Sequence, residues 1–210
     1  MKKLFIMLAS AIALCLMAIW LLTWLSWQPQ TWYNPPDYTV PEVKQLAERA
    51  EYRLNEEFHK VRSQEDVWKI RITDEAMNAW LAGRLEGWLT HDQEIEMPPE
   101  IKEPQIHATV EGIWFGAMVD LGNETHRPVA LQLWAWIDEG QLFVEPIAIR
   151  LGKIPIPVSL FTEVTKELQN NMNSVEAVAP LLDDRVVAIQ GVTFETGALI
   201  LTCQTQLPQQ

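Results

Sequence analysis

Residues 129–149, VALQLWAWIDEGQLFVEPIAI, decide the fold because they form two alternating segments joined by a turn sequence. One side of the first segment is entirely aliphatic: Val129, Leu131, Leu133, Ala135 and Ile137. Successive strand residues point to opposite faces, so this period of two indicates a strand. The triplet Asp138-Glu139-Gly140 is typical of a hairpin turn. We therefore predict two antiparallel strands with one aliphatic face.

The same period extends outward in both directions. It begins near Gln105, where Ile106, Ala108 and Val110 share a face, and it ends at residues 151–157, LGKIPIP. Paired prolines are excluded from central strands, so this segment should close the meander.

Residues 186–195 and 198–207 form a second predicted hairpin with a turn at Thr196-Gly197. Its apolar phase shifts by one residue across Gly191, which predicts a β-bulge.

Segments whose apolar residues recur at helical spacing precede and follow the meander in the sequence. Residues 41–62 form an amphipathic helix that begins at Pro41, and residues 67–72 alternate as a short strand. Thr73 should cap a second helix that extends to about Leu89, and Ser159 should cap a third. This order predicts an α+β domain: an antiparallel, curved sheet with amphipathic helices packed on one face.

Residues 1–27 are predicted to be a transmembrane anchor. Residues 4–27 are apolar and uncharged, and as a helix they extend about 36 Å, enough to cross a hydrocarbon core of about 30 Å. Lys2 and Lys3 precede the run, which favours a cytoplasmic N-terminus and an extracytoplasmic domain, periplasmic or on the cell surface. Four tryptophans gather at its far end, where indole rings favour the headgroup layer: Trp20, Trp24, Trp27 and Trp32.

A cleaved signal peptide is the alternative interpretation. The apolar run is longer than usual for such a signal, and no small-x-small cleavage site precedes the tryptophans. A lipoprotein signal at Cys15 would need a small residue where Leu14 stands. We therefore expect an uncleaved signal-anchor.

A proline-rich linker, residues 28–41, is expected to be a stiff, extended spacer that lifts the domain off the membrane. Residues 42–210 then form a single extracytoplasmic domain. The chain has 16 basic and 28 acidic residues. Since Lys2 and Lys3 precede the anchor, 14 bases remain outside against 28 acids, a net charge of −14. This charge argues against nucleic-acid binding.

The sequence carries no catalytic or metal-binding spacing. It lacks a Gly-x-Ser-x-Gly motif, and its histidines, His59, His91, His107 and His126, form no helical ligand pair. Cys203 falls on the apolar side of its strand, so we expect a buried, inert thiol that does not pair with Cys15. We expect neither an enzyme nor a cofactor.

Tryptophans supply the candidate binding residues. Trp134 and Trp136 stand opposite the aliphatic face of their own strand, whereas an antiparallel sheet with one wet face should carry polar residues there. Three further tryptophans complete the candidate ligand-binding set: Trp80, Trp88 and Trp114. Either helices cover these rings as core, or the rings line a groove or partner surface.

The segment Ile72–Leu81, ITDEAMNAWL, resembles the "threonine, two acids, asparagine, apolar pair" helix of the YpmS-like family. The resemblance continues through residues 151–157 and the closing hairpin, and it covers roughly residues 65–207. That family comprises small bacterial proteins with an N-terminal membrane anchor and an extracytoplasmic domain of unassigned function. The layout is also similar to bacterial envelope domains that cradle lipids.

Two functions follow as hypotheses. The first is a membrane-anchored extracytoplasmic protein whose apolar, tryptophan-lined groove binds a lipid or another hydrophobic ligand. The alternative is a non-catalytic structural or assembly partner in an envelope protein complex, bound through the same patch or through the anchor.

Overall fold

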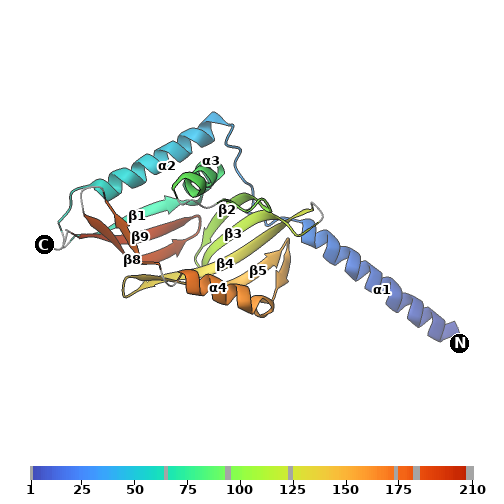
Figure 1. The fold of residues 1–210 in the computed structure, drawn as a ribbon. Helices are drawn as coiled ribbons and strands as arrows, with labels where there is room; N and C mark the ends of the chain where they lie inside the picture. The colour runs from blue at the N-terminus through green and yellow to red at the C-terminus, as the bar shows by residue number, and fades with distance from the viewer. Residues whose placement is uncertain are drawn as a thin grey trace.

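The computed structural model describes residues 2–63, 66–92, 96–122, 125–172, 175–181 and 185–206. A long helix, α1 (Lys2–Trp27), projects from an α+β domain made of two antiparallel sheets with helices (Figure 1). Among the described residues, one helical stretch, Phe5–Trp27, is long and apolar enough to cross a membrane. The predicted fold class is confirmed.

The larger sheet is the predicted meander. Its strands lie in chain order: β2 (Ile101–Thr109), β3 (Gly112–Asp120), β4 (His126–Asp138), β5 (Gln141–Leu151) and β6 (Ile154–Ile156). Glu139 and Gly140 turn the chain between β4 and β5 with φ of 48° and 78°. Positive φ at both central residues matches the twist of a two-residue hairpin, as the sequence predicted.

The smaller sheet contains the closing hairpin. Its order is β1 (Val67–Thr73), β9 (Ala198–Gln206), β8 (Val186–Glu195) and β7 (Val178–Pro180). The register of β8 on β9 shifts between Ile189 and Gly191, which confirms the predicted bulge. The strands thus form two sheets, a division that the sequence pattern did not reveal.

Helices flank the sheets. They are α2 (Pro41–His59), α3 (Asp74–Asp92) and α4 (Thr162–Met172), which a short 3-10 turn, η1 (Val158–Phe161), precedes. The Thr73 hydroxyl accepts a hydrogen bond from the Ala76 amide at 3.3 Å, so Thr73 caps α3 as predicted. In Figure 1, α2 and α3 lie along the upper side of the domain and α4 along the lower side, beside β5.

The core lies where the two sheets and α3 meet. Ile106, Ile113 and Leu133 of the meander pack with Phe194 of β8. Met77 and Leu81 pack against this cluster from α3. This core fixes one end of the meander against the smaller sheet.

β6 forms despite its prolines. Residues 154–156 pair with β5 through Ile149, Arg150 and Leu151, although the sequence predicted that LGKIPIP only ends the meander. β6 is an edge strand, where proline costs no ladder hydrogen bond on its free side.

The linker packs against the domain. Residues 28–36, here called the strap, carry Tyr33, whose hydroxyl donates to the Glu103 carbonyl at 2.8 Å, and Asn34, whose amide donates to Gln105 Oε1 at 2.7 Å. Burial raises the pKa of Tyr33 above its usual range, so this hydroxyl remains a donor. The strap is non-helical, as its prolines predict, but it lies on the meander and does not hold the domain away from α1.

Candidate functional site

Two side chains of α3 clasp the free edge of β2. Asn78 Oδ1 accepts from the Ile106 amide at 2.7 Å, and its Nδ2 donates to the Ile106 carbonyl at 2.8 Å. Asp74 Oδ1 accepts from the Ala108 amide at 3.0 Å, and the Gly197 amide donates to the Ala108 carbonyl at 2.9 Å. These bonds replace a neighbouring strand and satisfy the edge groups.

The clasp also sets the direction of α3. As the helix advances from Asp74 to Asn78, its partner on β2 moves back from Ala108 to Ile106. α3 therefore runs antiparallel to β2, toward the end of the meander that Ile101 begins.

The strap covers the outer face of the meander. Trp32 stacks on His107 with ring centroids 5.4 Å apart and lies 6.5 Å from Trp114. A Cβ at Gly116 would stand 2.7 Å from the Trp32 ring, so glycine there seats the strap. The Arg150 guanidinium lies on the same face, 5.1 Å from the centre of the Trp114 ring.

The inner face of the meander is aliphatic across its strands. Directly paired residues share a face, so the ladder registers give three apolar rows. The first is Ala108, Ile113, Leu133 and Pro146; the second is Ile106, Phe115, Leu131, Ile149 and Ile156; the third is Ala117, Val129, Leu151 and Ile154. Ile101 and Val119 extend this face by one further pair.

Coverage of this face is complete in the first row and partial in the other two. The first row is buried under the core. In the second row Ile106 is buried but Phe115 is 44% exposed, and Leu131, Ile149 and Ile156 are half-buried. All of the third row is half-buried. The aliphatic face therefore continues beyond the part that the core covers.

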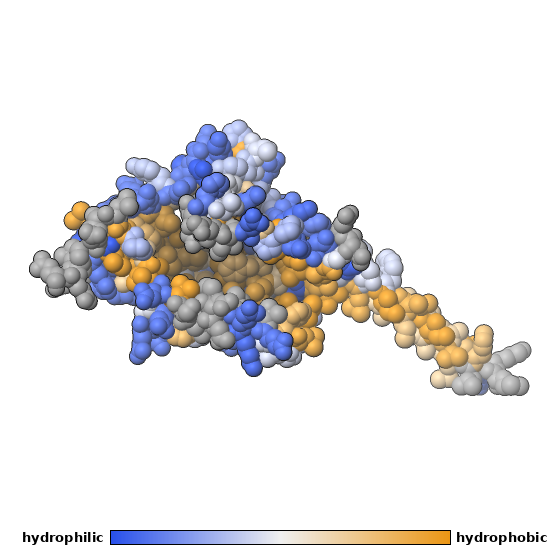
Figure 2. All heavy atoms as spheres, viewed as in Figure 1, coloured by the Kyte–Doolittle hydropathy of each residue, from blue (hydrophilic) through white to orange (hydrophobic). Residues whose placement is uncertain are grey.

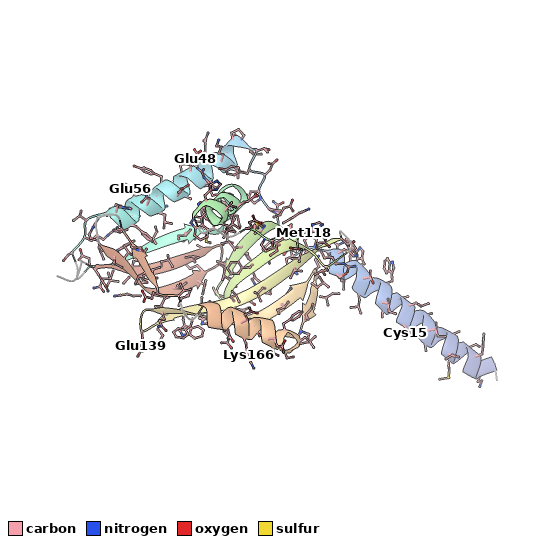
Figure 3. The ribbon with its side chains drawn as sticks, in the orientation of Figure 1. Cys15, Glu48, Glu56, Met118, Glu139 and Lys166 are labelled. Carbon is pink, nitrogen blue, oxygen red and sulfur yellow. The ribbon has the colours of Figure 1, made fainter. Side chains whose placement is uncertain are left out.

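The uncovered part forms the floor of a hollow. Figure 2 shows an apolar recess between two polar ridges, the upper one over α2 and α3 and the lower one over α4. Figure 3 shows that Glu48 and Glu56 of α2, and Lys166 of α4, belong to these ridges and not to the floor. The polar ridges and the apolar floor thus lie on different elements.

Exposed apolar side chains also lie on the helical segments next to the sheet. Trp88 follows Leu81 by two helical turns and therefore lies on the same side of α3; Leu81 packs on the core, whereas Trp88 is 41% exposed. Leu160 and Phe161 of η1, which follows β6 in the chain, are exposed as well.

One end of the meander meets the last turn of α1. The Lys153 amide donates to the Leu25 carbonyl at 3.0 Å, and Arg127 hydrogen-bonds the Ser26 hydroxyl. The Arg127 guanidinium lies 4.4 Å from the centre of the Trp27 ring. In Figure 3, Met118 marks this end, beside α1, and Glu139 marks the opposite end of the meander.

The five predicted tryptophans fall into separate places. Trp80 and Trp88 meet edge to face on α3 at 6.0 Å, whereas Trp114 is buried on the outer face under the strap. Trp134 contacts Phe194 of the core at 5.5 Å, and Trp136 stacks on Phe143 at 5.5 Å.

The predicted binding residues were the large rings, and none came from the aliphatic side of the same strand. The alternation of residues 129–137 had already revealed that side. Its incomplete coverage depends on where α3 and α4 pack, which periodicity does not encode.

A cavity of about 300 Å³ lies between the strap, α2, α3 and β2. It contains a histidine–carboxylate pair, His107 Nδ1 and Asp74 Oδ2, 2.7 Å apart. Asp74 already serves the clasp, and His107 carries the stacked Trp32, so both residues have a structural role. Within the described ranges, no three His, Cys, Asp or Glu side chains gather as a metal site.

No protein-family model matches this chain, and no curated protein matches its sequence.

Proposed function

We propose that this protein is a membrane-anchored, extracytoplasmic binding protein and that the hollow holds a lipid or another apolar ligand. The observation that carries the proposal is the incompletely covered apolar face around Phe115, which is 44% exposed, and the half-buried Ile149 and Leu151. A chain that covers about 200 Å² of such surface gains about 5 kcal/mol of affinity before its own ordering costs.

The orientation belongs to the same proposal. Lys2 and Lys3 precede the apolar stretch of α1, and the positive-inside bias retains such residues in the cytoplasm. The domain then faces the outer leaflet, where its acidic exterior keeps it soluble.

This proposal places Trp88 beside the ligand. Trp88 lies on the same side of α3 as Leu81, but beyond the part of the helix that packs on the core. Trp80 supports the Trp88 ring through their edge contact. For Trp114, Trp134 and Trp136, ligand contact stays a prediction.

Native mass spectrometry of the full chain, purified in detergent, tests the proposal, with organic extraction of any bound molecule. We expect a stoichiometric apolar ligand. Phe115→Glu should reduce its occupancy about tenfold or more, because a carboxylate on the floor faces the ligand without a partner. Val110→Glu is the control, since Val110 is 67% exposed in the β2–β3 turn.

A ligand-free mass for the unaltered chain would refute the proposal. Envelope proteins that co-purify with such a ligand-free chain would instead support the assembly-partner function.

A further inference from the structure

We propose that the occupant of the hollow is the acyl chain of a lipid from the bilayer that α1 crosses, and that it enters where the meander meets α1. This inference rests on the proposed function and adds the class of ligand and its route.

The first argument is the direction of the uncovered rows. From Ile113 to Val119 the inner face extends about 20 Å along β3, at about 3.3 Å per residue. The buried end contains Ile113, and the half-exposed end contains Ala117 and Val119. The aliphatic floor thus lengthens toward α1 and away from the core.

The second argument is the position of this end relative to the membrane. α1 has 26 residues, a length of about 39 Å, so a helix that crosses the hydrocarbon core brings its last turn to the headgroup layer. Trp27, an interfacial residue type, lies in that turn and contacts Arg127 at the start of β4.

Arg127 is also the register partner of Val119. The open end of the floor therefore lies at the membrane surface, joined to α1 by direct contacts. Figure 2 shows the corresponding apolar surface continuing from the domain onto α1.

The third argument is the chemistry of the floor. Its half-exposed members are almost all aliphatic: Ala117, Val129, Leu131, Ile149, Leu151 and Ile154. Apart from the Phe115 ring, such a surface offers no hydrogen bond and no aromatic group, so it suits a flexible alkyl chain better than a polar ligand.

Photo-crosslinking in a bilayer tests the inference. The full chain is reconstituted in dioleoyl phosphatidylglycerol vesicles that contain a trace of phospholipid with a diazirine at the end of one acyl chain. After illumination and digestion, we expect adducts on β3 and β4 peptides around Phe115 and Leu131. Adducts on α1 report insertion.

Val129→Glu places a charge in the third row, and Val110→Glu places the same charge on the exposed β2–β3 turn. We expect the first change to lower the β3 and β4 adducts about tenfold and the second to leave them unchanged. Ala117→Trp fills the same row without a charge and should have the effect of Val129→Glu. It decides the test if the Val129 variant fails to fold.

A parallel arm separates this inference from the proposed function. A diazirine fatty acid is added from solution to the detergent-solubilised chain. If it labels the hollow while the bilayer lipid labels α1 only, entry from the bilayer is wrong and apolar binding stands. If neither labels the hollow, both fail. Bilayer labelling that persists in both third-row variants would also overturn the route.

Discussion

At the scale of single residues, Cys203 shows how burial controls chemistry. It is fully buried in β9, and burial raises the pKa of its thiol to about 11. Because the pKa is raised, the neutral thiol dominates in the folded state at pH 8, and the reactive thiolate is scarce. The alternation of Leu199, Leu201 and Cys203 predicted this position.

We therefore expect Cys203 to resist alkylation while the chain is folded. In a Cys15→Ala background, iodoacetamide should leave the folded protein unmodified at pH 8 and modify it once denaturant is added, since an unfolded thiol has a pKa of about 8.5. The modification is followed by intact mass. Rapid labelling of the folded chain at pH 8 would show that β9 opens.

At the scale of elements, the clasp between α3 and β2 depends on two polar side chains one helical turn apart. Asn78 is buried and satisfies both backbone groups of Ile106, while Asp74 satisfies Ala108. These residues belong to the ITDEAMNAWL segment. The segment therefore has a structural explanation: it docks a helix on a strand edge.

Asn78→Ala should lower the free energy of unfolding by about 2–3 kcal/mol, because the buried Ile106 amide and carbonyl lose their partners. Asn55→Ala is the matched control, since Asn55 is exposed on α2. Urea denaturation followed by circular dichroism measures both. Equal small losses for the two variants would contradict the clasp.

Much of the element order could be predicted because each element carries its own period. The amphipathic helix from Pro41, the capped α3, the β4–β5 hairpin and the bulge at Gly191 all follow from local sequence. The division into two sheets could not, because alternation says which residues share a face but not which strands pair.

The candidate site was less predictable for a related reason. Trp134 and Trp136 were conspicuous because two large rings stood opposite an aliphatic face. Whether a face is covered depends on long-range packing. On β5, an extra residue at the register shift, between Ala148 and Pro146, further separates sequence phase from spatial position.

At the scale of the whole molecule, the decisive contact is between α1 and the meander. Gly152 has a φ of +56°, and a Cβ there would lie 2.4 Å from the Leu25 carbonyl oxygen. The end of α1 therefore fits directly against the β5–β6 turn, with no room for a side chain.

Gly152→Ala should loosen this junction. Gly140→Ala is the matched control: Gly140 also has a positive φ, of +78°, but nothing lies within 4 Å of its added Cβ. Both variants carry the backbone cost of alanine at positive φ, so their difference reports the contact with α1. Hydrogen exchange of the Lys153 amide, which donates to Leu25, should accelerate in the Gly152 variant only. Equal exchange in the two variants would show that the junction tolerates the methyl group.

The strap restrains the domain relative to α1. Its hydrogen bonds to Glu103 and Gln105 hold residues 28–36 against the domain. These residues therefore do not act as a flexible linker. When α1 crosses a bilayer, as proposed, these contacts hold the domain at one height and one tilt above it. Under the proposed function, such a domain exchanges lipid only with the adjacent leaflet, and transfer to a distant membrane requires a separate carrier protein.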